Sequence, residues 1–119
     1  MHVVCERFKK RREEYCVPAA VASALSITKL DAVQRLQKIE PNSRGCYHAM
    51  SYATVLGKQA WRYPGPWRNR PTLARWLREH KREAVISAAH HAMHVKGGKV
   101  LEGNGHVPMR GRVVDVVWL

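Results

Sequence analysis

A cysteine, a histidine and an asparagine have the types and the chain order that a cysteine-nucleophile site requires. Cys16 opens an apolar, alanine-rich segment, His91 opens a β-prone segment, and Asn104 follows the next pair of glycines. In such a site the thiolate attacks an acyl carbon, and the imidazole holds the ion pair and then protonates the leaving group. The amide fixes the imidazole tautomer, and the backbone N–H of Cys16 would be one oxyanion donor. We take these three residues as the candidate catalytic set.

The position of Cys16 favours a reactive thiol. A cysteine has an ordinary pKa of about 8.5, and a helix N-terminus and a nearby imidazolium both stabilise its thiolate. Cys5 lies in an N-terminal arm, and Cys46 lacks an equally apolar continuation. An odd number of cysteines without a secretory pattern predicts reduced thiols. No Cys-x-x-Cys pair is present, so neither a structural zinc nor any other cofactor is predicted.

A hairpin is predicted to place the imidazole beside the amide. The segments His91–Val95 and Val100–Asn104 flank Gly97–Gly98, a pair typical of a two-residue hairpin turn. Counting outward from that turn places Asn104 directly opposite His91. Directly opposed side chains lie about 4.5–5.5 Å apart at Cβ, within hydrogen-bonding reach of an amide and an imidazole.

Strand alternation selects one histidine from a cluster of three. Met93 and Val95 share the face of His91, whereas His90 and His94 point to the other side. The same counting places Glu102 opposite Met93 and diagonal to His91. We therefore expect His91 to be the histidine that exchanges a proton with Cys16.

The elements that must position these residues are helices first and strands second. We expect one helix at Val17–Leu25 and a second that follows a Thr28 cap and runs to Ile39, with Ala32, Leu36 and Ile39 inward. We expect a third helix at Tyr47–Leu56 and a fourth after a Thr72 cap, with Trp76 in the core. We expect strands at Glu83–Ser87, His91–Val95, Val100–Asn104 and Val113–Trp118. This order predicts an α+β fold. The loop from Tyr63 to Pro71 is predicted to be rigid, because it is rich in proline and tryptophan.

Size and charge further restrict the class of protein to which this sequence can belong. With 119 residues and 45 % hydrophobic composition, residues 1–119 fit one domain, of which 1–15 form an N-terminal arm. The sequence has no apolar run of membrane-spanning length and no secretory pattern, so we expect a cytoplasmic protein without a membrane partner. The net charge of +12 favours anionic partners such as nucleic acid. A simple solvated basic surface is the alternative, because the charge is dispersed.

Four segments resemble the papain-like cysteine peptidase superfamily. Tyr15–Ala20 resembles the nucleophile helix of its bacteriocin-processing, double-glycine branch, and His91–Glu102 resembles the histidine hairpin of that branch. Together with Thr72–His80 and Arg112–Leu119, they are similar to small papain-like proteins of tailed phages and prophages. The resemblance implies a papain-like domain whose nucleophile helix packs on a C-terminal antiparallel sheet.

The function implied is a cysteine-dependent hydrolase, a peptidase or isopeptidase acting on a peptide or protein through a Cys16–His91–Asn104 triad. Deamidation and acyl transfer use the same chemistry. The superfamily usually places an oxyanion glutamine upstream of the cysteine, but Phe8–Glu14 contains none. Phage relatives often carry an acid where Glu102 stands, so Glu102 competes with Asn104. The alternative is an inactive papain-like protein of phage origin that binds a host protein or nucleic acid through its basic surface.

Overall fold

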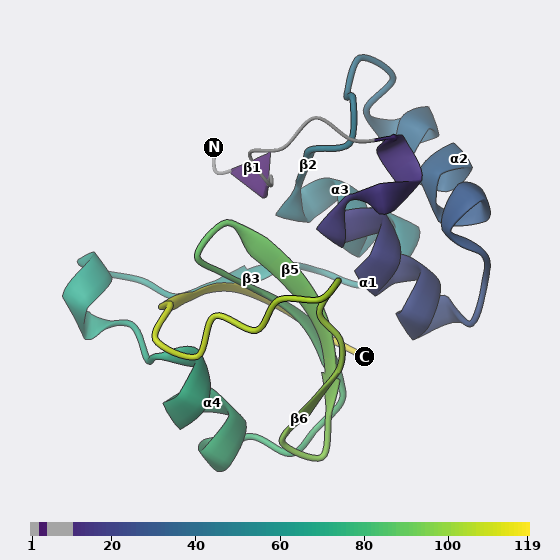
Figure 1. Cartoon of the computed structure of the whole chain (residues 1–119). Coiled ribbons are helices and arrows are strands. Elements are labelled where there is room, and N and C mark those ends of the chain that lie inside the picture. Colours follow the sequence, from purple (N-terminus) through teal and green to yellow (C-terminus); the bar gives the residue numbers. More distant parts are fainter. Residues whose placement is uncertain (1–2, 5–10) are drawn as a thin grey trace.

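The computed structural model describes residues 3–4 and 11–119, so Cys5 and most of the expected arm lie outside the described residues. The N-terminal half contains β1 (Val3–Val4), the 3-10 helix η1 (Arg12–Glu14), α1 (Cys16–Leu25), α2 (Lys29–Ile39), β2 (Tyr47–His48) and α3 (Ala49–Val55). The C-terminal half contains β3 (Trp61–Arg62), the 3-10 helix η2 (Trp67–Asn69), α4 (Leu73–Glu79), β4 (Ala84–Ala88), β5 (His91–Lys96), β6 (Lys99–Glu102) and β7 (Val113–Trp118). The α+β prediction is confirmed (Figure 1).

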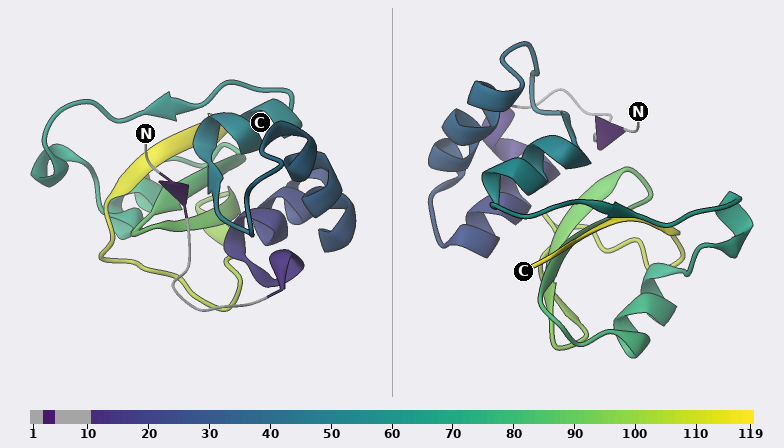
Figure 2. Two further views of the ribbon diagram at one scale, coloured as in Figure 1. Left: turned by 90° about the horizontal axis from the view of Figure 1, so that it is seen from above. Right: turned by 180° about the vertical axis from the view of Figure 1, so that it is seen from behind.

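A five-stranded antiparallel sheet, ordered β3-β7-β4-β5-β6, separates the helices. Helices α1 to α3 cover one face and α4 covers the other (Figures 1 and 2). Side chains alternate between two cores, as the period of a strand requires. Val85, Ala92 and Val117 pack with α1 to α3. Ile86 and Met93 pack with α4, where Trp76 is fully buried as predicted.

Helix α1 is a core helix with apolar residues all around its first two turns. It begins at Cys16, and Pro18 lies in the first turn, where a missing N–H removes no helical hydrogen bond. Residues 16–22 are all buried. The helix ends where Ser26 adopts a left-handed conformation with φ of 55°. The helix expected at Val17–Leu25 is therefore present and begins one residue earlier, and the sheet and two helices hold it in place.

Threonine caps begin the two amphipathic helices, as predicted. Thr28 Oγ1 accepts from the backbone N–H of Asp31 at 3.1 Å in α2, and Thr72 Oγ1 accepts from Arg75 at 3.2 Å in α4. Ala32 and Leu36 are buried, but Ile39, which was expected to face inward, is 44 % exposed. Because Ile39 is the last residue of α2, the helix ends before another element can cover it.

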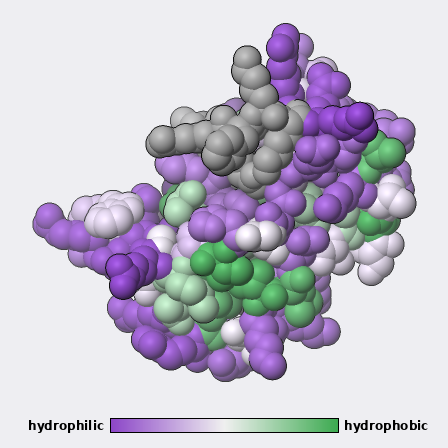
Figure 3. All heavy atoms as spheres, in the orientation of Figure 1, coloured by the Kyte–Doolittle hydropathy of each residue, from purple (hydrophilic) through white to green (hydrophobic). Residues whose placement is uncertain are grey.

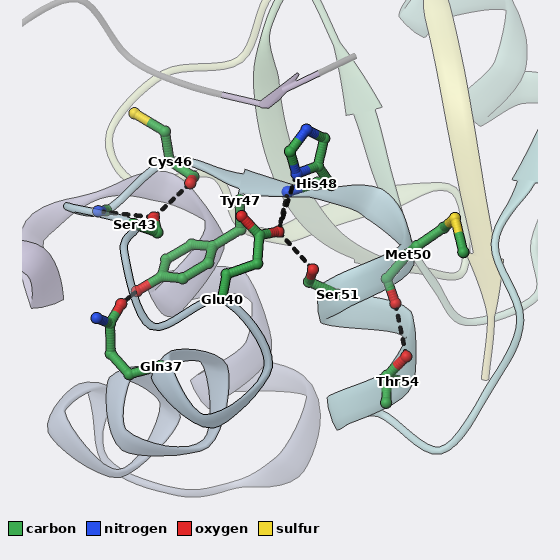
Figure 4. A network of polar contacts seen from close by, with 10 residues as sticks. Gln37, Glu40, Ser43, Cys46, Tyr47, His48, Met50, Ser51 and Thr54 are labelled. Atoms are coloured by element: carbon green, nitrogen blue, oxygen red, sulfur yellow. Dashed lines mark hydrogen bonds and ion pairs between the residues drawn. The ribbon is translucent and has the colours of Figure 1, made fainter. Parts of the chain in front are cut away.

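The segment that leads into α3 is organised by the Glu40 carboxylate (Figure 4). This group accepts from the backbone N–H of His48 at 2.8 Å, from His48 Nδ1 at 3.1 Å and from the Ser51 hydroxyl. Residues 47–48 pair with β1 as a short strand, so the helix expected from Tyr47 begins at Ala49 instead. Cys46 in this segment is disulfide-bonded, so the prediction of reduced thiols is wrong for that residue.

No single helix in the described part of the chain is long and apolar enough to cross a membrane. Helices α1 and α2 pass that test of length and composition only as a pair, with a bend of 110° between them.

Candidate functional site

The candidate site lies at the edge of β5 where its neighbour β6 ends. From the turn, Lys96 pairs with Lys99 and Val95 with Val100, as the sequence predicts. The register then shifts at an irregularity between His94 and Val95, and β6 ends at Glu102 opposite His94. The first residues of β5 therefore extend beyond β6, and other groups of the protein lie against this part of the strand.

Cys16 is one of these groups. Its sulfur accepts a hydrogen bond from the backbone N–H of Ala92 at 3.4 Å, although the two residues are 76 positions apart. Ala92 directly follows His91, so the fold brings the thiol to the start of the histidine strand. Cys16 is the first residue of α1, whose first turn contains no acidic residue. The amide donor and the positive end of the helix dipole both favour the thiolate over the thiol.

His91 is held through one ring nitrogen by a backbone carbonyl. Its Nε2 lies 2.5 Å from the carbonyl oxygen of Gly103, which also accepts from the backbone N–H of His106 at 3.0 Å. A carbonyl oxygen only accepts, so Nε2 carries the proton, and Nδ1 is the basic nitrogen of the neutral ring. The His106 ring contacts His91 edge to face, with ring centroids 5.2 Å apart.

Asn104 does not occupy the position expected of it. The shifted register and the early end of β6 remove the direct opposition of Asn104 and His91, and they place Glu102 opposite His94 instead of Met93. Asn104 lies in a turn with φ of 52°. Its Nδ2 donates to the carbonyl of Glu14 at 2.8 Å, and its backbone N–H donates to Glu102 Oε2 at 2.9 Å. The Gly103 carbonyl is thus a partner that fixes the tautomer of His91.

Strand parity places His91 and His94 on opposite faces of the sheet, and the packing shows that the face toward α1 is that of His94 and Ala92. Met93 and Val95 lie in the core beneath α4, whereas His94 reaches α1 on the other face. His90 is exposed in the turn that precedes β5. Among the three clustered histidines, His91 is the one whose following amide binds the Cys16 sulfur.

A second chain of polar groups, not expected from the sequence, lies on the α1 side of the sheet. His94 Nδ1 lies 2.7 Å from Ser23 Oγ, and His94 Nε2 lies 2.7 Å from Glu83 Oε2. Ser23 comes from the same helix as Cys16. The hydroxyl can donate or accept, so these bonds are satisfied whether the ring is neutral or protonated. This chain fixes α1 against β5 and thereby helps to position the Cys16 sulfur.

Access to the thiol is restricted. Cys16 is 1 % exposed and His91 is 3 % exposed. The hydrogen bond from Asn104 to Glu14 joins the turn after β6 to the residues just before α1. Within the described ranges, 3–4 and 11–119, no group of three or more His, Cys, Asp or Glu residues is arranged to hold a metal ion.

The chain matches no family model, no curated protein and no solved structure.

Proposed function

We propose that this protein is a papain-like cysteine hydrolase of the peptidase or isopeptidase class that acts in the cytoplasm. Cys16 is the nucleophile and His91 is the acid–base group. The observation that carries the proposal is the hydrogen bond from the Ala92 amide to the Cys16 sulfur, because it joins the helix start to the residue next to the histidine. A reactive thiol needs both a stabilised thiolate and a nearby proton acceptor, and this contact supports both.

In the proposed reaction the thiol proton moves to His91 Nδ1, while Nε2 keeps its proton on the Gly103 carbonyl. The thiolate attacks the acyl carbon, and the backbone N–H of Cys16 stabilises the oxyanion. His91 then gives its Nδ1 proton to the leaving amine, and a thioester remains on Cys16. Water, deprotonated by His91, cleaves the thioester and releases a carboxylic acid and the thiol. The role of Asn104 in this scheme is to hold the Gly103 turn in place.

The first test is a reaction that does not require the natural substrate. With p-nitrophenyl acetate in excess, we expect a stoichiometric burst of p-nitrophenol as Cys16 is acylated. Cys16→Ala should abolish the burst, and His91→Ala should slow it by about a hundredfold or more. A burst that persists in Cys16→Ala, with unchanged circular dichroism, would contradict the proposal.

A second test measures the thiol itself. At about pH 6 an ordinary thiol is almost fully protonated, so rapid alkylation by iodoacetamide reports a stabilised thiolate. We expect modification at Cys16, located by mass spectrometry, and slower modification in His91→Ala. Alkylation of unfolded and folded protein at equal rates would remove the basis for a nucleophile.

The burial of the thiol favours a second candidate, a papain-like protein that binds its partner and performs no reaction. A residue that is 1 % exposed reaches a substrate only after a covering segment moves. If the site stays closed, function rests on the basic surface and its net charge of +12. Binding to nucleic acid or to a host protein that is unchanged in Cys16→Ala, together with no burst, would favour this candidate.

A further inference from the structure

A pocket of about 210 Å³ lies at the turn between β4 and β5, and its walls carry positive charge. Arg70, His90 and Arg112 contribute basic side chains, and Trp67 contributes an indole. Ala89, Gly111 and Val114 complete the lining, so none of the acidic side chains in the described part of the chain lines the pocket. Cys16 and His91 do not line it, so its function is independent of the proposed hydrolase.

The guanidinium groups are arranged for an anion. Arg70 Nε is buried and has no hydrogen-bond partner among the residues that the structure describes. A buried donor without an acceptor is unfavourable by itself. Arg112 Nη1 donates to the carbonyl of Arg70 at 2.8 Å, so the second guanidinium is anchored beside the first. Because Arg70, Arg112 and His90 all line the pocket, an oxyanion bound there would lie close to three basic side chains.

The aromatic side of the pocket is open to a planar group. Trp67 is 63 % exposed, and the Arg112 guanidinium carbon lies 5.1 Å from the centre of its ring. The ring belongs to η2, which follows Pro66 and precedes Pro71, so its loop is restricted in conformation. This segment stands out from the sheet at the edge of the molecule and is surrounded by a hydrophilic surface (Figures 1 and 3). The Arg112 guanidinium lies over one face of the indole, so a base would stack on the other face.

The turn that carries His90 is held in an unfavourable backbone conformation. Ala89 and His90 both have positive φ, of 51° and 59°, although neither is glycine. Gly111 packs directly beneath this turn, because a Cβ built there would lie 2.8 Å from the Ala89 Cβ. The close contact fixes the turn against the segment that carries Arg112. The basic side chains of His90 and Arg112 therefore lie on segments whose relative position is fixed.

We propose that this pocket binds single-stranded nucleic acid, with a backbone phosphate between Arg70, Arg112 and His90 and a neighbouring base stacked on Trp67. The positive charge of the lining residues favours an anionic ligand. The exposed indole of Trp67 favours a nucleotide over an acidic peptide. A carboxylate side chain would use the guanidinium groups and leave the indole exposed. The net charge of +12 would draw any polyanion toward the surface, but only a base gains from the ring.

The test uses the full chain and a fluorescein-labelled oligothymidine of about twelve nucleotides, with binding measured by anisotropy. We expect Trp67→Ala to weaken binding about tenfold and Trp67→Phe to restore most of it, because a phenyl ring still stacks. Arg112→Ala should weaken binding about tenfold and lower the slope of log affinity against log salt by about 0.7. Arg78, an exposed residue of α4 outside the pocket, gives the matched control, and Arg78→Ala should change affinity less than about twofold.

Three outcomes would overturn the proposal. One is an equal loss in Arg78→Ala and Arg112→Ala, which would mean unspecific attraction. Another is equal competition by polyglutamate at the same charge concentration, which would favour an acidic protein partner. The third is equal affinity for an abasic oligonucleotide, which would exclude stacking. Circular dichroism melts of each variant, and Arg112→Lys as a variant that keeps the charge, separate these outcomes from misfolding.

Discussion

His91 and His94 lie on the same strand and are both 3 % exposed, but their hydrogen-bond partners differ. His94 lies between a serine hydroxyl on α1 and the Glu83 carboxylate, each 2.7 Å from one ring nitrogen. His91 binds a neutral backbone carbonyl through Nε2 and lies next to the amide that holds the Cys16 sulfur. Both rings are buried, so it is their partners that distinguish them.

The difference shows how a strand can separate structure from chemistry. The Ser23 hydroxyl and the Glu83 carboxylate engage both ring nitrogens of His94, so this ring links α1 to the start of β4. A carbonyl fixes the tautomer without adding charge, which suits a ring that must accept and release a proton. In the proposed function His91 is the acid–base group, whereas His94 links α1 to the sheet, and the following predictions test that division.

The largest expected effect is on the reactivity of Cys16. His91→Ala should lower the rate of Cys16 acylation by about a hundredfold or more, because the acceptor of the thiol proton is removed. His94→Ala should lower it by less than about tenfold once the measurement is made at a temperature where the variant is folded. Stopped-flow release of p-nitrophenol measures both. Equal losses in the two variants would contradict a separate chemical role for His91.

The second effect is on stability and should have the opposite order. His94→Ala should lower the free energy of unfolding by about 2–3 kcal/mol, because it leaves the Ser23 hydroxyl and the Glu83 carboxylate without their buried partner. His91→Ala loses a hydrogen bond to one carbonyl and should cost about 1 kcal/mol. Urea unfolding followed by circular dichroism gives both values. A larger loss in His91→Ala would reverse the assignment.

The helix and the strand that carry these residues were accessible from the sequence. The apolar run and Pro18 identified the helix that begins at Cys16, and strand parity separated His91 from His94. Both inferences depend on local periodicity, which the fold preserved. The partners of His94 were not accessible, because Ser23 and Glu83 approach it only after α1 packs on the sheet.

The position of Asn104 shows where local counting failed. A bulge in a hairpin shifts every later pair by one residue, and nothing in the alternation of β5 and β6 announces it. Gly103-Asn104-Gly105 was the missed signal, since an asparagine between two glycines is typical of a turn and not of a strand. The left-handed turn at Ala89 and His90 had no such signal, because it contains no glycine or asparagine.

The third prediction concerns the turn at Asn104, which follows Gly103, the residue whose carbonyl binds His91. If the Asn104 side chain holds this turn closed through Glu14, Asn104→Ala should expose the thiol and increase the rate of iodoacetamide labelling about fivefold. A triad member would behave differently, since its loss would slow labelling and acylation. Asn104→Asp keeps the shape but removes the amide donor, so it should also label faster. Slower labelling in both variants would support Asn104 as the third member of the triad.

The smallest effect concerns a second histidine–carboxylate pair, His48 and Glu40. The His48 side chain is 31 % exposed, against 4 % for His94, and the Glu40 side chain is 20 % exposed, against 33 % for Glu83. Burial alone raises the pKa of the Glu40 carboxyl, but hydrogen bonds from Ser51 and from the backbone and ring of His48 hold that pKa below its ordinary value. A lowered folded-state pKa means that this stabilisation is present above about pH 4.5 and is lost as the pH falls through the folded-state value. Glu40→Gln should therefore cost about 1 kcal/mol at pH 7 and less near pH 3. Urea unfolding at the two pH values measures this difference. If Glu40→Gln lowers the free energy of unfolding equally at both, packing of the Glu40 side chain, and not its charge, stabilises this segment.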